Sequence, residues 1–338
     1  ASLDANTTGQ QNVAVGRDSL TSNTTASYNS AFGDESLGSC TTGTSNTAVG
    51  NDALYGTTTG YRNTAVGDQA LGANTTGTDN VAVGYGSLVA NTTASNNTAM
   101  GFQALTANTT GADNVAVGKD SLDSNTTGAG NVGIGSDALQ GNVSGSSNVA
   151  VGNDALKSNT VSGQIGIGNQ SLEANTSGTE NTAVGFQTLM TQSSNGYMNT
   201  AVGYQAGRLN TSGQSLTAIG FKALEANTTG DGNTAVGQQA LVVNTTGANN
   251  VGVGQSALLA NTTGSYNTAV GHQALQASTA DDHSTAIGAQ ALMTQGAGGV
   301  GDGRNTAVGR DAGRLNTTGT YMVAVGYEAL EFNTTGSF

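Results

Sequence analysis

One five-residue motif recurs along the whole chain: Asn, a β-branched residue, Ala, a large apolar residue and Gly, as in Asn63–Gly67. It occurs 19 times, and its glycines are 17 residues apart except for steps of 16, 18 and 21. Each 17-residue repeat holds about two large apolar side chains, too few for a core of its own. Stacking the repeats would bury these side chains in one column, which is how a solenoid folds.

The consensus repeat reads N-(T/V)-A-V-G-x-x-A-L-x-A-N-T-T-G-x-x, and we number its positions from the first Asn. Because alternate strand residues share a face, positions 2 to 4 predict a short strand with positions 2 and 4 pointing inward and the Ala at position 3 outward. Leu at position 9 would point inward from a second wall. Where Gly207 and Gly313 replace it, we expect Leu209 and Leu315 to fill the interior. The N-T-T-G stretch predicts a corner, since Asn and Gly tolerate left-handed backbone.

The asparagines at position 1 predict a ladder, because identical side chains stacked in register can hydrogen-bond along the column. Members of this ladder include Asn46, Asn63, Asn80, Asn97 and Asn114. A second ladder is expected at position 12. Cys40 occupies position 12 in its repeat, and we interpret it as a small residue filling an asparagine slot.

A helical interpretation fails on spacing, because positions 4 and 9 are five residues apart. The glycines at positions 5 and 15 would each cost a helix about 1 kcal/mol. Charged residues make up only 9% of the chain, and the net charge is −13. Such a composition is typical of disorder, but a disordered chain does not need a strict period. The sequence therefore predicts an all-β, parallel β-solenoid of about 19 coils, continuous over residues 1–338.

Two insertions interrupt the regular coils. Leu189–Gln192 recurs as Leu292–Gln295, and each copy is followed by extra residues, at 193–198 and 295–304. We expect these two loops to leave the surface of the shaft, and they are the candidate segments for contact with a receptor or glycan if the chain does more than space. The candidate contact residues are Gly196, Tyr197, Asp302 and Arg304. Both ends of the sequence stop within a coil, which we interpret as an excerpt of a longer fibre protein.

The motif Asn63-Thr64-Ala65-Val66-Gly67 resembles the N-S-V-A-I-G repeat of YadA-like heads of trimeric autotransporter adhesins. The longer phrase from Asn199 to Ala206 is similar to repeats of bacterial and phage tail-fibre-domain proteins. The resemblance implies a left-handed parallel β-roll with three chains side by side, located outside the cell on a cell surface or a phage virion. It also implies that small residues at position 3 let the chains approach. The coil is a few residues longer here than in the adhesin heads.

Composition excludes several classes of function. There are 22 acidic and 9 basic residues, and nucleic-acid binding needs clustered Lys and Arg. No run of 18 apolar residues predicts a membrane span. His272 and His283 lack neighbours that would make a metal or catalytic site, so we expect no cofactor.

These observations favour a non-enzymatic structural shaft of an extracellular fibre or adhesin, a homo-oligomer that mediates attachment to a receptor or glycan not yet known. One alternative is a phage tail-fibre segment that binds a receptor. Another is an ice-binding or glycan-binding solenoid, although adjacent threonines in a turn would point to different faces. A fibre-borne depolymerase is a further alternative, and it would need a pair of carboxylates in a groove.

Overall fold

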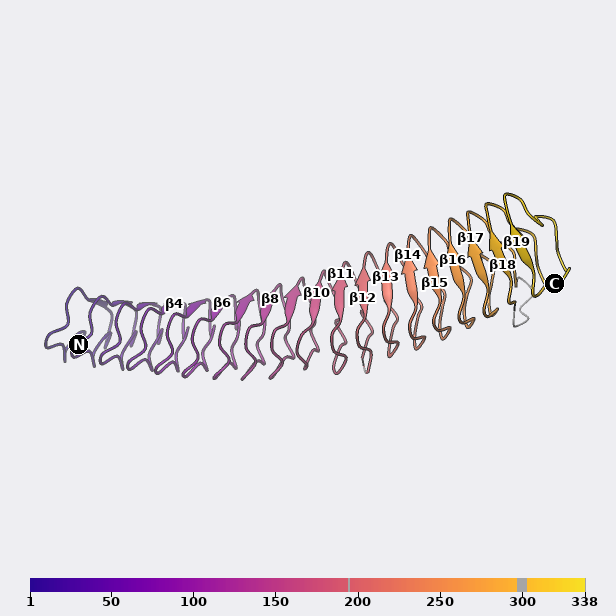
Figure 1. The fold of residues 1–338 in the computed structure, drawn as a ribbon. Coiled ribbons are helices and arrows are strands. Elements are labelled where there is room, and N and C mark those ends of the chain that lie inside the picture. The colour runs from indigo at the N-terminus through magenta and orange to yellow at the C-terminus, as the bar shows by residue number, and fades with distance from the viewer. Residues whose placement is uncertain (194, 297–302, 338) are drawn as a thin grey trace. The chain divides into compact units, whose positions relative to one another are not determined.

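The computed structural model describes residues 1–193, 195–296 and 303–337. The chain divides into two compact units, Ala1–Gln164 and Ile165–Phe338. In each unit the backbone winds in stacked coils, and every full coil contributes one three-residue strand (Figure 1). The first unit contains β1 (Val13–Val15), β2 (Ser30–Phe32), β3 (Thr47–Val49), β4 (Thr64–Val66), β5 (Val81–Val83), β6 (Thr98–Met100), β7 (Val115–Val117), β8 (Val132–Ile134) and β9 (Val149–Val151). The second contains β10 (Ile165–Ile167), β11 (Thr182–Val184), β12 (Thr200–Val202), β13 (Thr217–Ile219), β14 (Thr234–Val236), β15 (Val251–Val253), β16 (Thr268–Val270), β17 (Thr285–Ile287), β18 (Thr306–Val308) and β19 (Val323–Val325).

Within each unit every strand pairs in parallel with the strand of the next coil, and equivalent positions face one another. In the first unit, for example, Ala48 of β3 is opposite Ala65 of β4. The longer corner between β11 and β12 leaves this register unchanged, because Ala183 is opposite Ala201. The predicted all-β parallel solenoid with coils of about 17 residues is therefore confirmed.

Backbone hydrogen bonds join coils outside the strands as well. The Leu54 N–H donates to the carbonyl of Ala70 in the next coil at 3.0 Å, and the Gly50 N–H donates to that of Phe32 in the preceding coil at 2.8 Å. Each coil is thus bonded to both neighbours along much of its length, which satisfies backbone groups that the stack buries. A proline would remove one of these donors, consistent with a chain of 52 Gly and no Pro.

The left-handed backbone predicted for the N-T-T-G corner lies at other positions of the coil. Gly50, at position 5, has φ 134°, and a Cβ there would lie 2.5 Å from the carbonyl oxygen of Gly67, so only glycine fits. Left-handed backbone also occurs at Asp52 and Leu54, positions 7 and 9, and not at Asn74 or Gly77 of an N-T-T-G stretch. Left-handed backbone costs a non-glycine residue about 1–2 kcal/mol. Burial of the leucine, worth roughly 1.5–3 kcal/mol, offsets that cost.

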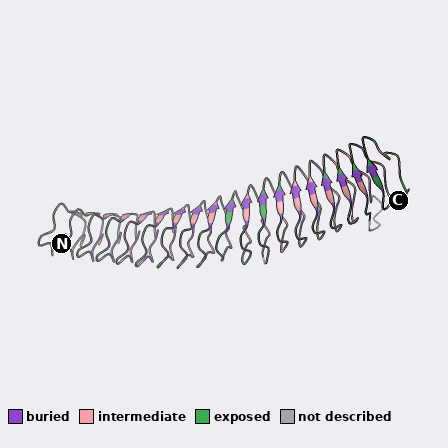
Figure 2. Ribbon diagram, in the orientation of Figure 1, coloured by how far each residue is buried: buried purple, intermediate pink, exposed green. Residues whose placement is uncertain are grey.

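The prediction of which strand face is buried was wrong. Ala48 and Leu54 are fully buried, whereas Val49 is 38% exposed. The same alternation recurs from strand to strand, with the middle residue in the interior (Figure 2). The interior is too narrow for a larger group at position 3: a Cβ built on Gly133 would already lie 3.3 Å from Leu122 Cδ1. Small residues occupy position 3 because they face the leucine column.

The expected replacements for the missing leucines were also wrong. Leu209 and Leu315 are only half-buried. The residues that fill the interior are Leu216 and Met322, each 2% exposed, which stand at position 1 of the following coil in place of Asn. A side chain on Gly313 would meet Met322 Cε at 2.5 Å, so the glycine and the methionine share one space.

Candidate interaction surface

The asparagines expected to form a ladder lie in one buried column, where no partner can reach them. The backbone N–H of Asn97 donates to Oδ1 of Asn80 at 3.0 Å, and that of Asn80 donates to Oδ1 of Asn63 at 3.1 Å. The Asn80 side-chain amide also donates to the carbonyl of Ala94 at 2.9 Å. The same column includes Asn46 and Asn114. Each asparagine thus fixes the start of a strand to the preceding coil and to the corner.

The asparagines at position 12 form the second buried column. The Asn91 amide donates to Oδ1 of Asn74 at 2.9 Å, and the Asn108 amide donates to Oδ1 of Asn91 at 3.0 Å. Cys40 stands in this column, where its Sγ donates to the carbonyl of Gly43 at 3.3 Å. Burial raises the pKa of the Cys40 thiol to about 11. A thiol that stays protonated and buried is a poor nucleophile, so Cys40 has a packing role.

The first predicted contact loop is a corner of the coil. Gly196 is buried, and its carbonyl accepts hydrogen bonds from Gln192 Nε2 at 2.8 Å and Asn181 Nδ2 at 3.0 Å. It therefore takes the place of the corner glycine in a coil that is one residue longer, and it is not available to a partner. Tyr197 is 37% exposed and remains on the surface.

The second predicted contact loop is described only in part. Asp302 lies outside the described residues. The side chain of Arg304 donates from Nη1 to the Tyr321 hydroxyl at 3.2 Å, and its guanidinium lies 5.5 Å from the centre of that ring. Tyr197 precedes β12 and Arg304 precedes β18, six strands later in the same unit. The structure does not bring these two candidates together.

Sequence reasoning missed a surface feature that repeats in every coil, which we call the apolar ribbon: the outward side chains at positions 2 and 4 of β1–β9 in the first unit and of β10–β19 in the second. Position 4 is apolar in all 19 strands, whereas position 2 is Val or Ile in eight of them and Thr or Ser in eleven. None of these strands, all within the described part of the chain, contains a charged residue. With about 4.8 Å between strands, the ribbon extends roughly 40 Å in each unit. Its position 4 residues are more than a third exposed at Phe32, Val49, Val66, Met100, Ile134, Ile167, Val202, Ile219, Val270 and Ile287, among others.

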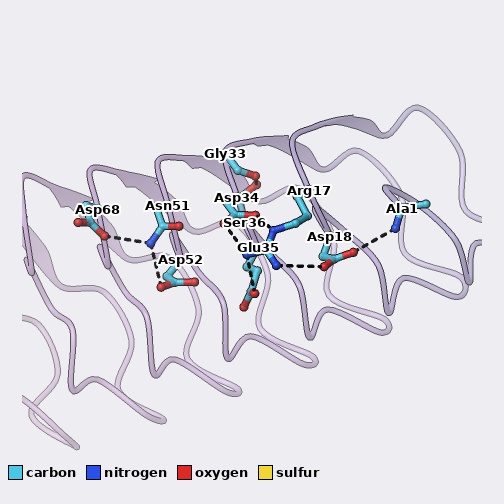
Figure 3. Close-up of polar contacts among 10 residues, drawn as sticks. All are labelled: Ala1, Arg17, Asp18, Gly33, Asp34, Glu35, Ser36, Asn51, Asp52 and Asp68. Atoms are coloured by element: carbon cyan, nitrogen blue, oxygen red, sulfur yellow. Dashed lines mark hydrogen bonds and ion pairs between the residues drawn. The ribbon is translucent and has the colours of Figure 1, made fainter.

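Charged side chains gather beside the ribbon, at positions 6 and 7 after the corner glycine. Figure 3 shows such a row in the first coils, where Arg17 reaches Asp34 in the next coil with an Nη2–Oδ2 distance of 2.7 Å. The hydrogen bond from Arg17 lowers the pKa of Asp34. Arg62 and Asp79 form a similar pair between coils at positions 17, on the other side of the strands, at 2.7 Å. The ribbon thus has polar borders, on which charged groups such as Arg17 and Asp34 pair between neighbouring coils.

Aromatic rings also stand on these borders. At position 6, Tyr85 and Phe102 stack with centroids 5.5 Å apart, and Phe186, Tyr204 and Phe221 form a stack with spacings of 5.3 and 5.4 Å. The five rings are 40–47% exposed. Exposed aromatic groups beside an uncharged and partly apolar face are typical of interaction surfaces.

The described residues provide little for other kinds of site. Among them no helix is long and apolar enough to cross a membrane. No group of three or more His, Cys, Asp or Glu residues in that part of the chain is placed to hold a metal ion. His272 is exposed at position 6, and His283 stacks on Tyr266 at 5.2 Å in a different column. No protein-family model matches the chain, and no curated protein matches it.

Proposed function

We propose that the chain is the structural shaft of an extracellular fibre or adhesin, on a cell surface or a phage virion, and that it has no catalytic role. The observation that carries this proposal is the equivalence of the coils. Strand register, glycine corner and asparagine columns repeat from coil to coil, so length can change by whole coils without a new packing problem. This property suits a spacer, and a catalytic site would instead need convergent groups at one place.

A coil deletion tests the shaft. Residues 97–113 form one complete coil, and their removal would join Asn96, at position 17, to Asn114, at position 1, in the original register. The natural fibre that contains this segment should fold, lose about 4.8 Å of shaft and keep its attachment to target cells. Fibre length in electron micrographs and a cell-attachment assay provide the two measurements.

The matched control removes eight residues, 97–104, which breaks the register and should prevent the following coils from stacking. Loss of attachment after the 17-residue deletion, in a fibre that still folds, would contradict a pure spacer role. It would place a specific binding site in the deleted coil.

We infer a second candidate function, glycan binding, from the stack of Phe186, Tyr204 and Phe221. A row of side-chain amides accompanies it at position 7, where Gln205 Nε2 donates to Gln187 Oε1 at 2.9 Å and Gln187 continues to Gln170 at 2.9 Å. Exposed aromatic rings next to amides are the groups that bind sugars through apolar and hydrogen-bonding contacts.

Substitution of Tyr204→Ala tests glycan binding, with binding to a glycan array as the measurement. Tyr55→Ala, at an exposed tyrosine outside any ring stack, is the matched control. Glycan binding that Tyr204→Ala abolishes and Tyr55→Ala preserves would support the second function. The absence of binding by the unsubstituted chain would exclude it.

A further inference from the structure

We propose that the outward face of β11–β14 binds the surface of ice crystals. These four strands are neighbours in the second unit (Figure 1), and each carries a threonine at position 2 and an aliphatic residue at position 4. We call these outward side chains the threonine array; its threonines are Thr182, Thr200, Thr217 and Thr234. The inference goes beyond the shaft function and does not require it, because the array lies on four strands of one unit.

The first argument is that the hydroxyls of the array are available to water. The threonines at position 13 use their hydroxyls within the fold: Thr211 Oγ1 donates to the carbonyl of Thr228 at 2.9 Å, and Thr228 Oγ1 donates to that of Thr245 at 3.0 Å. Among the described residues, no such hydrogen bond joins a hydroxyl of the array to the protein. The threonines of the array are partly or fully exposed, so their hydroxyls can bond to water.

The second argument is the regularity of the array. The four strands pair in parallel and in register, so Thr200 of β12 lies between Thr182 and Thr217. The hydroxyls therefore recur about every 4.8 Å along the stack, and the aliphatic row at position 4 lies roughly 6.6 Å away along the strands. Threonine, valine and isoleucine are stiff at χ1, so these groups are held in place before anything binds. The objection that adjacent threonines point to different faces applies to positions 13 and 14, and not to position 2.

The third argument identifies the occupant. A partner for the array must be uncharged, must repeat at the interval of the strands, and must offer a hydrogen-bonding group to each hydroxyl, because burial of a hydroxyl without one is unfavourable. The surface of ice meets all three conditions. It is neutral, its water molecules both donate and accept, and equivalent molecules along one axis of ordinary ice are spaced at nearly the interval of the strands. The aliphatic row between the hydroxyls carries no charge that would hold a hydration shell of its own.

The first unit provides a contrast within the same chain. Position 2 is threonine in three of its nine strands, against seven of ten in the second unit. The strands β7–β9 carry the same aliphatic row at position 4, but their position 2 residues are Val115, Val132 and Val149. That face has the spacing of the array without its hydroxyls. We therefore assign ice binding to the threonine array, and not to the spacing of the coils alone.

The substitution Thr217→Tyr in the complete chain tests the proposal, because the ring would stand above the array and hold its neighbours away from a flat surface. Two matched controls place the same ring elsewhere. Thr229→Tyr lies at the exposed corner position 14 of the same coil, and Val132→Tyr lies at position 2 of β8 in the first unit. Thermal hysteresis and the inhibition of ice recrystallisation provide the measurements, and circular dichroism checks the fold.

The unsubstituted chain and both controls should inhibit ice growth at the same concentrations, whereas Thr217→Tyr should lose the inhibition. If Thr217→Tyr fails to fold, Thr217→Lys tests the same position, since a lysine side chain can extend into solvent from a strand surface. Thr217→Lys should also lose the inhibition, because its ammonium group keeps a hydration shell that does not fit the ice lattice.

An unsubstituted chain that leaves ice growth unchanged up to millimolar concentration would overturn the proposal, and so would a folded Thr217→Tyr variant with full activity. Losses from Thr229→Tyr or Val132→Tyr as large as that from Thr217→Tyr would also overturn it, because the activity would then not belong to the threonine array. These outcomes are independent of the shaft function, which is measured by fibre length and cell attachment after coil deletion.

Discussion

The coils of the first unit and those of the second unit fill their interiors with side chains from different positions. Around Leu122 and Asn131 the first unit follows the consensus, with a leucine at position 9 and an asparagine at position 1 of the next coil, both fully buried. Twice in the second unit a glycine replaces that leucine, and a large apolar residue replaces the asparagine nine residues later: Leu216 after Gly207, and Met322 after Gly313. The interior is therefore filled in every case. Where position 9 is small, the residue at position 1 of the next coil is large and apolar.

A double-mutant cycle at Gly313 and Met322 is the strongest test of this comparison. Met322→Asn should reduce the free energy of unfolding by about 4 kcal/mol, because it empties the space beside Gly313 and buries an amide. Gly313→Leu alone should cost about 2 kcal/mol through overlap with Met322 Cε. The double variant restores the consensus and should lose only about 3 kcal/mol, an interaction of about 3 kcal/mol. Denaturant unfolding provides the measurement.

Leu315→Ala is the control for that cycle, since Leu315 is the residue that the sequence suggested as the replacement. Because Leu315 is only half-buried, Leu315→Ala should reduce the free energy of unfolding by about 1 kcal/mol. A loss at Leu315 as large as that at Met322, or penalties that simply add in the double variant, would mean that Gly313 and Met322 do not share their space.

The asparagine column of the first unit should be less tolerant of a single change. Asn114→Ala removes the Oδ1 that accepts from the Asn131 N–H at 2.9 Å and the amide that donates to Gly128 at 2.9 Å. A buried donor left without an acceptor costs about 1–3 kcal/mol, and with the second lost bond we expect a total of about 3 kcal/mol. Thermal or denaturant unfolding measures the loss.

Asn51→Ala is the matched control for Asn114→Ala. Asn51 is exposed and donates only to side-chain carboxylates, at 2.9 Å for Asp52. Its replacement should change stability by less than about 0.5 kcal/mol. If Asn114→Ala and Asn51→Ala reduced the unfolding free energy equally, the hydrogen bonds of the buried column would contribute little to stability.

The period of the sequence was sufficient to predict the solenoid, the coil length and both asparagine columns, because register and stacking follow directly from repetition. It could not decide which strand face is buried. In Thr64–Val66 the alternation is equally consistent with either face, and the deciding quantity is the width of the interior, which depends on the leucine of the opposite wall. A signal for the exchange at Met322 was present, since both glycines at position 9 precede an apolar position 1 residue by nine residues.

Polar residues also replace consensus residues in the second unit, and one of these replacements introduces a titratable group. Ser278 and Gln295 stand in the position 12 column, and Gln295 Nε2 donates to Ser284 Oγ at 2.6 Å. Asp281 occupies a corner position that is glycine in most coils; it is 3% exposed and accepts from Ser278 Oγ at 3.4 Å. Burial, with a smaller contribution from the nearby charge of Asp282, raises the pKa of Asp281 to about 6.

The buried carboxyl group of Asp281 predicts that the stability of the chain depends on pH. An unfolded aspartate titrates near pH 3.9, so the folded protein holds an extra proton between about pH 4 and pH 6. Stability is therefore greatest below this window and falls as the pH rises through it, by roughly 3 kcal/mol in all. Asp281→Asn should add about that much to the unfolding free energy at pH 8 and almost nothing at pH 3.5.

Asp113→Asn, at an exposed position of the first unit, should change stability little at either pH and serves as the control. Unfolding free energies measured from pH 3.5 to pH 8 distinguish the outcomes. A gain from Asp281→Asn that is the same at both ends of this range would show that the benefit comes from packing of the amide. A gain that grows from about pH 4 and levels off above about pH 6 would show that the buried, ionised carboxylate of Asp281 is what lowers the stability of the second unit.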